Sequence, residues 1–129
     1  MTTIAQLVAE LDALENLQAR LAAIATRTDS ERRYELIQLR KKLSGQITIM
    51  GHLSESLFAG APDKLAEFRR HYSAMRSVTA LHQAEWPAVR LGDVDDLYRQ
   101  SALRVSTANG VFVRWLREAL ARDGMGDEK

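Results

Sequence analysis

The stretch LIQLRKKLSGQITIMGHLSESLFAG, residues 36–60, contains the pattern that decides the fold. Its apolar residues recur at three- and four-residue spacing, which is typical of one face of an α-helix. Gly60 suits the end of that helix, and Pro62 suits the first turn of another, where its missing N–H costs nothing. The stretch therefore predicts a long helix followed closely by a second one. Its expected inward face consists of Leu36, Leu39, Leu43, Ile47, Met50, Ser54 and Leu57.

A helix is also expected before this stretch, over residues 3–27, where apolar residues again recur at helical spacing. The two helices are separated by a Thr-Asp-Ser turn, in which Asp29 or Ser30 is the expected cap of the second helix. The inward face of the first helix is expected to comprise Ile4, Leu7, Val8, Leu11, Leu14, Ala22 and Ala25.

Two more helices are expected after Pro62. The third ends at Trp86, because Pro87 disfavours the α conformation in the residue before it. The fourth opens at Asp93, whose side chain is the expected cap. The third helix is expected to turn inward Leu65, Phe68, Tyr72, Met75, Thr79, His82 and Trp86, and the fourth Leu97, Tyr98, Ser101, Val105, Ala108, Phe112, Leu116 and Ala119.

Four long helical segments with short connections predict one all-α domain folded as an up-down-up-down four-helix bundle. The expected domain covers residues 1–122, and the polar residues 123–129 are expected to form a flexible tail. One alternative stays open in the fourth helix. VSTANGVFV, residues 105–113, alternates around Asn-Gly, a strong hairpin signal. If this segment is helical, the cost of Gly110 favours close packing or a kink there.

Composition limits the classes of function that fit this chain. Eighteen basic and seventeen acidic side chains give a net charge of +1, unlike most dedicated nucleic-acid or membrane-surface binders. The absence of cysteine excludes disulfides, thiolate metal sites and a cysteine nucleophile. The first residues, MTTIAQLVAELDALE, carry acids where a secretory signal has a basic start, and no apolar run has the length of a membrane helix. We therefore expect a cytoplasmic protein.

The three histidines, His52, His71 and His82, raise the question of a metal site, because Glu-x-x-His pairs are typical of metal-binding bundles. His52 lies about 160° around its helix from Met50 on the inward face, so His52 and Glu55 are expected on the exterior. His82 lies on an inward stripe, where we expect a buried or half-buried neutral imidazole that donates to a hydroxyl or a backbone carbonyl. A pH-sensitive or ligand-contacting role is the alternative.

No sequence motif indicates catalysis or a bound cofactor, since phosphate-binding glycine loops and a serine-nucleophile motif are all missing. Asp93, Asp95 and Asp96 could attract a divalent cation, but helix capping and the helix dipole explain acids at a helix start. We expect no catalytic residue, no cofactor and no metal. The alternative metal site would use His71, His82 and Glu67.

The chain resembles the hemerythrin-like (HHE) four-helix bundles in layout and cadence. The similarity lies in LDALENLQARLAAI (11–24), HLSESLFAG (52–60), LAEFRRHYSAMRSV (65–78), AEWPAVRLGDVDDLYRQSA (84–102) and FVRWLREAL (112–120). The resemblance implies an inward di-iron centre of histidines and carboxylates, in proteins many of which bind or sense oxygen.

The positions at which that family carries its metal ligands hold other residues here. The resemblance places the first-helix histidine on or near Leu11, and the second-helix H-x-x-x-E on Met50 and Ser54. In the third helix His71 stands for the first residue of H-x-x-x-H, but Met75 occupies the second position, and the fourth helix contains no histidine. The resemblance therefore implies a bundle whose metal centre has been replaced by apolar packing.

Apolar residues outside the inward faces point to an interaction surface. Leu17, Leu21 and Ile24 form a second ridge on the first helix, which we interpret as the surface for a homodimer or a helical partner. A broad buried face on a centrally placed helix is the alternative. Further apolar residues outside the main faces are Ile37, Ile49, Leu103 and Val113.

A basic group also lies on the second helix, but interleaved Glu31 and Glu35 and the lack of an aromatic stacking row favour a solvated charged face over a phosphate-binding one. This group consists of Arg32, Arg33, Arg40, Lys41 and Lys42.

Taken together, these patterns predict a non-enzymatic cytoplasmic bundle that acts through protein–protein contacts, in a regulatory or adaptor-like role, without nucleic-acid or membrane partners. The alternative is a metal- or small-ligand-binding sensor of the hemerythrin-like type. A weaker third possibility is an enzyme whose site comes from residues interpreted here as structural.

Overall fold

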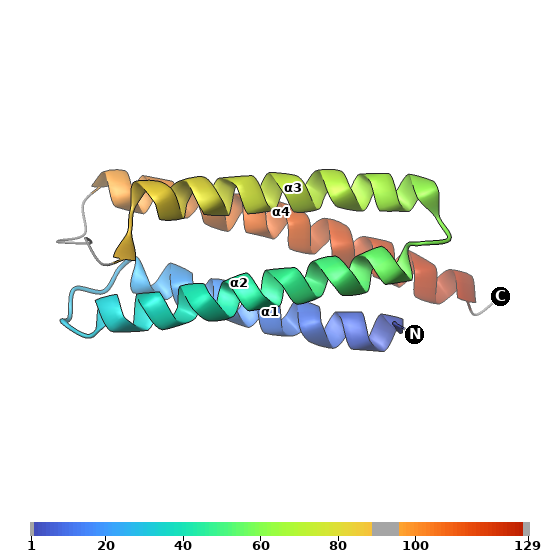
Figure 1. Cartoon of the computed structure of the whole chain (residues 1–129), viewed down its shortest axis with the longest axis horizontal. Helices are drawn as coiled ribbons and strands as arrows, with labels where there is room; N and C mark the ends of the chain where they lie inside the picture. Colours follow the sequence, from blue (N-terminus) through green and yellow to red (C-terminus); the bar gives the residue numbers. More distant parts are fainter. Residues whose placement is uncertain (1, 89–95, 128–129) are drawn as a thin grey trace.

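The computed structural model describes residues 2–88 and 96–127 of the chain. These residues form helices and no strand, which confirms the prediction of an all-α fold. The helices lie side by side along the long axis of the molecule, and both termini lie at the same end (Figure 1). The helices of this part of the chain are α1 (Ile4–Ile24), α2 (Arg32–Leu57), α3 (Pro62–Glu85) and α4 (Asp96–Asp127).

The turn between α1 and α2 differs from its prediction. The N-cap residue of α2 is Glu31, which makes no side-chain capping bond, so the expected cap at Asp29 or Ser30 is wrong. The Asp29 carboxylate instead accepts hydrogen bonds of 2.8 and 2.6 Å from Arg27, whose guanidinium also donates to Glu35 at 2.6 Å. Ion pairs rather than a cap therefore connect the two helices.

The third helix begins and ends as predicted. Pro62 lies in the first turn of α3, where its lack of an N–H removes no helical bond. The helix ends at Glu85, and Trp86 before Pro87 has left the helical conformation. The expected cap at Asp93, and Asp95 with it, lies outside the described residues.

The fourth helix is continuous through residues 105–113, so the hairpin alternative is wrong. No atom lies within 4 Å of the position of a Cβ at Gly110, so the close packing expected there is also absent. The helix continues to Asp127, beyond residue 122, where the domain was expected to end.

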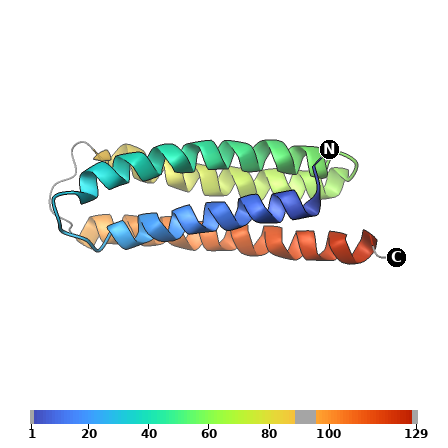
Figure 2. The same ribbon diagram turned by 90° about the horizontal axis from the view of Figure 1, so that it is seen from below.

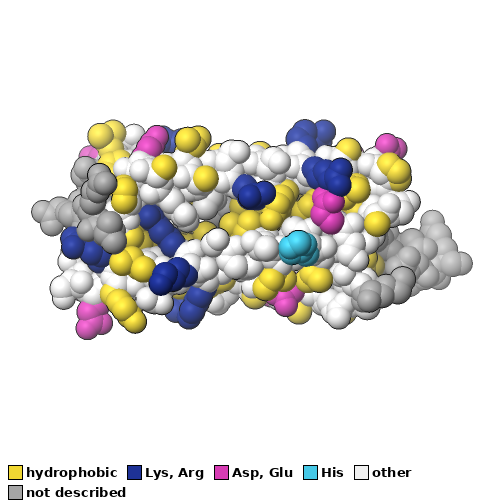
Figure 3. Space-filling view, in the orientation of Figure 1, with side chains coloured by type: hydrophobic (Ala, Val, Ile, Leu, Met, Phe, Trp, Pro, Cys, Tyr) yellow, Lys and Arg dark blue, Asp and Glu magenta, His cyan; other side chains and the backbone are white. Residues whose placement is uncertain are grey.

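The helices pack as neighbours around a common interior. α1 lies between α2 and α4 (Figure 2), and α3 packs most closely on α4. The contact between α2 and α3 is the least extensive of these, and hydrophobic side chains are visible between the two helices in Figure 3. At this contact the Tyr72 hydroxyl donates to the Ile47 carbonyl at 2.7 Å. A Cβ at residue 51 would lie 2.6 Å from that hydroxyl oxygen, so Gly51 leaves the space that Tyr72 needs.

The interior consists of two clusters of buried apolar side chains along the bundle axis. We call the part near the termini the aromatic half; Phe58, Phe68 and Phe112 lie at its centre. We call the part near the α1–α2 turn the chamber half, because a small cavity borders it. The buried residues of the aromatic half are Leu7, Leu11, Leu14, Leu43, Ile47, Met50, Phe58, Phe68, Met75, Phe112, Val113, Leu116, Ala119 and Leu120; those of the chamber half are Ile24, Ala25, Leu36, Leu39, Ala88 and Tyr98.

The predicted inward faces are confirmed for most of α2 and α3 but need correction on α4. Leu97 was expected inside and is 65% exposed, while Tyr98 beside it is 2% exposed. Asn109 and Val113 were not placed on the inward face, yet they are 7% and 5% exposed. The buried face of α4 is thus broader on the side that meets α1 than the sequence pattern indicated.

Candidate functional site

His52 and Glu55 lie at the surface, as predicted, and do not form a metal site. His52 is exposed, and the Glu55 carboxylate accepts hydrogen bonds of 2.7 and 2.6 Å from Arg69 of α3. This contact with Arg69 holds the pKa of Glu55 below its ordinary value. The pair connects α2 to α3 across their outer edge.

His71 and Glu67 both contact Trp115 rather than a common cation position. The His71 ring stacks on the Trp115 ring with 4.8 Å between centroids. The Trp115 indole N–H donates to the Glu67 carboxylate at 3.3 Å. His71 and His82 are eleven positions apart on one helix, or roughly 16 Å along its axis, so one ion cannot reach both.

The alternative metal site is therefore not assembled. Among the residues that the structure describes, no group of three or more His, Asp or Glu side chains is arranged to hold a metal ion. Four of the positions that the family resemblance implies for metal ligands are interior: Leu11, Met50 and Ser54 are fully buried, and Met75 is 1% exposed, whereas His71 is only partly buried. Three of these four side chains are apolar and pack in the aromatic half.

His82 has the environment that the sequence predicted for it. The ring is half-buried, and its Nδ1 lies 2.6 Å from the Ser101 hydroxyl oxygen. Burial, together with the positive charges of Arg40 and Arg104, lowers the pKa of His82 to about 4. The imidazole is consequently neutral near pH 7.

A small cavity lies beside His82, inside the chamber half. Its volume is about 40 Å³, and residues of all four described helices line it. We call it the polar chamber, because polar side chains contribute from every helix: Gln18 from α1, Arg40 from α2, Thr79 and His82 from α3, and Asn109 from α4. No Asp or Glu is among its lining residues.

Several polar atoms that border the polar chamber have no hydrogen-bond partner within the described chain. They are Gln18 Nε2, Arg40 Nη2, Thr79 Oγ1 and Asn109 Oδ1, each of them buried. In native structures the large majority of buried polar atoms have a hydrogen-bond partner. Four unpartnered atoms in residues that line one cavity therefore make it a candidate site for a polar ligand.

Arg40 supplies the formal positive charge of the chamber. Its Nη1 donates to the Trp86 carbonyl at 2.8 Å, which holds the side chain in position near the end of α3. Burial lowers the pKa of Arg40, because a low-dielectric surrounding disfavours the charged form. The guanidinium nevertheless stays protonated at neutral pH.

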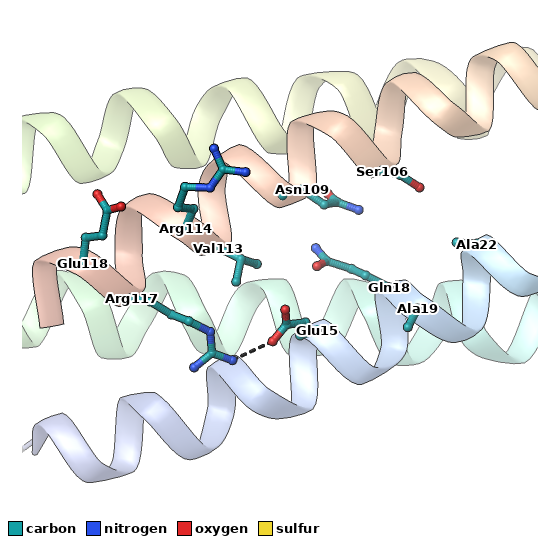
Figure 4. Close-up of a pocket in the computed structure, with 11 residues that line it drawn as sticks. Glu15, Gln18, Ala19, Ala22, Ser106, Asn109, Val113, Arg114, Arg117 and Glu118 are labelled. Carbon is teal, nitrogen blue, oxygen red and sulfur yellow. Dashed lines mark hydrogen bonds and ion pairs between the residues drawn. The ribbon is translucent and has the colours of Figure 1, made fainter. Parts of the chain in front are cut away.

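An open groove lies between α1 and α4, beside the polar chamber (Figure 4). It has a volume of about 540 Å³ and shares Gln18, Ala22, Ser106 and Asn109 with the lining of the chamber. The Gln18 and Asn109 side chains extend toward each other from the two helices (Figure 4). Farther along the groove, Arg117 donates to Glu15 at 2.6 Å.

The ridge predicted on the first helix is not an exposed surface. Ile24 is 2% exposed and belongs to the buried cluster of the chamber half. Leu17 and Leu21 are partly buried and pack against both clusters. The interpretation of these residues as an interaction surface is wrong for Ile24, because α1 packs against two neighbouring helices and needs a broad apolar face.

The exposed apolar side chains lie elsewhere. Of the six large hydrophobic residues that are exposed in the described part of the chain, four lie on α3 and α4: Leu81 (63%), Leu97 (65%), Leu103 (66%) and Val111 (50%). Leu81 and Leu103 also line a groove of about 770 Å³ between these helices. We call this groove the α3–α4 face; Val78, Leu81, Glu85, Leu103 and Arg104 are among its lining residues.

Among these α3–α4 residues, the sequence had marked only Leu103 as lying outside the inward faces. Leu81 was missed, although its position is about 120° from Met75 on the inward stripe of α3. Helical spacing thus places Leu81 away from the inward stripe, but it does not show whether a neighbouring helix covers that side of α3.

The basic group of α2 does not form one exposed face. Arg32 is 8% exposed, and Arg40 turns toward the polar chamber. Arg33, Lys41 and Lys42 are exposed, so the expectation of a solvated charged face is confirmed for these three residues and is wrong for Arg32 and Arg40. No helix in the described residues has the length and apolar character needed to cross a membrane.

No family model, curated protein or solved structure matches this chain. The resemblance to the hemerythrin-like bundles therefore stays a prediction.

Proposed function

We propose that this protein is a non-enzymatic cytoplasmic protein that acts through protein–protein contacts, as a homodimer formed through its α3–α4 face. In this proposal the helices form an up-down-up-down bundle of the hemerythrin-like type, in which the apolar residues Leu11, Met50 and Met75 occupy metal-ligand positions. One observation carries the proposal: Leu81 and Leu103, 63% and 66% exposed, line the same open groove.

Exposed leucines in one groove are unfavourable in an isolated chain. Each fully buried leucine side chain contributes roughly 1.5–3 kcal/mol relative to an exposed one. Covering Leu81 and Leu103 of two copies in one interface recovers much of this energy, with Val78 adding apolar area beside them. Contiguous apolar patches on soluble proteins commonly mark interaction sites.

The charges of the α3–α4 face favour a second copy of the chain as the partner. Glu85 and Arg104 line the same groove, and neither has an ion-pair partner among residues 2–88 and 96–127. A twofold axis presents the same patch on both copies, so it can place Glu85 of one copy opposite Arg104 of the other. A face that carries both signs of charge is complementary to itself.

Sedimentation velocity of the full chain between about 1 and 200 µM tests this proposal. We expect a concentration-dependent dimer, and we expect Leu81→Glu and Leu103→Glu to be monomeric across the range because each places a carboxylate in the apolar interface. Ile49→Glu is the matched control, since Ile49 is 41% exposed on α2, away from this face. A wild-type chain that stays monomeric, or a control that dissociates equally, would refute the proposal.

A charge exchange tests the arrangement of the two copies. Glu85→Arg and Arg104→Glu should each weaken the dimer by roughly tenfold in Kd, and the double variant should recover most of the loss. If the double variant does not recover the affinity, the pairing of Glu85 with Arg104 is wrong. The apolar contact is tested separately by Leu81→Glu and Leu103→Glu.

A further inference from the structure

We propose that the polar chamber binds a small monovalent anion, such as a halide or formate, on the guanidinium of Arg40. The proposal does not rest on the α3–α4 dimer: the chamber lies among the four helices beside the α1–α4 groove, and it shares only His82 with the lining of the α3–α4 face. The inference rests on the unpartnered groups, the charge and the size of the chamber.

The unpartnered groups form a lining that suits an anion. Arg40 Nη2 and Gln18 Nε2 are donors, and the Thr79 hydroxyl can donate as well. Asn109 can present either its amide oxygen or its amide nitrogen to the chamber, depending on the rotation of the amide group. Thr79 and Asn109 are 6% and 7% exposed, so bulk solvent does not satisfy them. Groups that can donate hydrogen bonds therefore line this one cavity from three or four helices.

The charge balance of the chamber also favours an anion. Burying a guanidinium without a counter-charge is unfavourable, and buried charges in proteins are normally paired. No carboxylate lines the chamber, and Arg40 is bonded to a neutral carbonyl rather than to an acid. The positive potential extends to His82, whose protonation Arg40 and Arg104 oppose. A bound anion supplies the negative charge that the four helices lack at this place.

The size of the chamber limits the anion. A water molecule needs a cavity volume of roughly 10–15 Å³. The chamber has a volume of about 40 Å³. That space suits a halide or a planar anion of a few atoms, and excludes an organic anion as large as gluconate. The α1–α4 groove shares Gln18, Ala22, Ser106 and Asn109 with the lining of the chamber, so the chamber lies directly beside solvent-filled space (Figure 4).

Thermal unfolding of the full chain distinguishes a bound anion from general salt effects. The protein is held at constant ionic strength in sodium gluconate, which is replaced stepwise by sodium chloride, bromide or formate. We expect a saturable rise in Tm of roughly 3–5 °C for the small anions, because a ligand that binds only the folded state stabilises it. Equal Tm values in gluconate and bromide would overturn the proposal.

Two variants with a matched control assign the effect to the chamber. Arg40→Met should abolish the rise in Tm, and so should Asn109→Leu, which fills the chamber but keeps the charge. Lys41→Met removes a neighbouring exposed cation from the same helix and should keep the full response. A response that persists in both chamber variants, or disappears in the control, contradicts the assignment.

Bromide diffraction provides a readout that does not depend on any variant folding. Crystals of the wild-type chain grown in sodium bromide should show an anomalous peak within hydrogen-bond distance of the Arg40 guanidinium. Peaks confined to the protein surface, with only water in the chamber, would show that the chamber is simply hydrated and would overturn the proposal.

Discussion

The aromatic half and the chamber half of this bundle are built from the same four helices but fill their interiors differently. In the aromatic half, Phe68 contacts Phe58, Tyr72 and Phe112 at ring-centroid distances of 5.1–6.2 Å. A single buried hydroxyl there, that of Ser54, has no partner among the described residues. In the chamber half, four unpartnered polar atoms surround a cavity.

The two halves therefore differ in what they contribute: the aromatic half contributes stability, and the chamber half contains polar groups that can contact a ligand. Large apolar rings in close contact supply burial energy and dispersion, and they leave no space for a guest. Buried polar groups around a cavity cost stability, since each has lost its bonds to water. We infer that the aromatic half stabilises the fold and allows the chamber half to keep groups that bind a ligand.

The strongest test of this comparison removes the centre of the aromatic half. Phe68→Ala should lower the free energy of unfolding by roughly 3–5 kcal/mol, because it removes a buried ring and leaves a cavity. Urea unfolding followed by circular dichroism measures the loss. Val111→Ala, at a 50% exposed position, is the control and should change stability by less than about 0.5 kcal/mol. A loss below 1 kcal/mol for Phe68→Ala would contradict the assignment of stability to this half.

A smaller effect is expected where α2 meets α3 in the aromatic half. Gly51→Ala places a Cβ 2.6 Å from the Tyr72 hydroxyl, and should cost roughly 1–2 kcal/mol because the ring must move from its bond to Ile47. Gly45→Ala is a matched control on the same helix, where nothing lies within 4 Å of the new Cβ. It should stabilise the protein by up to about 1 kcal/mol through helix propensity. Equal effects of the two substitutions in urea unfolding would disprove the close approach.

The chamber half should give the protein a pH dependence through His82. Because its folded pKa, about 4, lies below the ordinary value of 6.5, the unfolded chain binds more protons between these values. The contribution of neutral His82 to the free energy of unfolding should be fully present above pH 6.5 and should decrease as the pH falls toward 4. The decrease attributable to His82 should be roughly 1–2 kcal/mol, allowing for its partial exposure. Urea unfolding at several pH values, compared with His82→Asn, measures it; an unchanged curve in the variant would exclude His82 as the cause.

The smallest effect is expected for removing one unpartnered hydroxyl of the chamber. Thr79→Val keeps the side-chain shape but replaces a buried polar atom by a methyl group, so in gluconate buffer the protein should gain up to about 1 kcal/mol. Thermal unfolding measures the gain. A loss of more than 1 kcal/mol would show that the hydroxyl already has a partner, and would weaken the contrast between the two halves.

Helical periodicity predicted much of the interior correctly, and its errors have a common cause. The inward stripe of α2, from Leu36 to Ser54, is buried as expected, because α2 covers only a narrow part of the interior. On α1 and α4 the buried faces are wider, and Ile24, Asn109 and Val113 were assigned to the outside or left unassigned. Periodicity gives the direction of a face but not its width, which depends on how many helices pack against it.

The candidate site was only partly visible in the sequence. His82 was identified as a half-buried neutral imidazole bonded to a hydroxyl, and the Ser101 contact agrees with that interpretation. Gln18 was not among the candidate site residues, and Arg40 was assigned to a solvated basic group. The sequence therefore indicated one member of the polar chamber and did not predict the chamber.

The amino-acid sequence by itself determined the four helical segments of the described chain, the two ends of α3 and the sense of most inward faces, since proline sterics and apolar spacing act within a few residues. Only the tertiary structure decided that Gln18, Arg40, Thr79 and Asn109 meet around one cavity, and that Leu81 stays exposed. These outcomes depend on which helices become neighbours and how closely they approach. Contacts between residues far apart in the chain are set by the packing of whole helices, which no local pattern specifies.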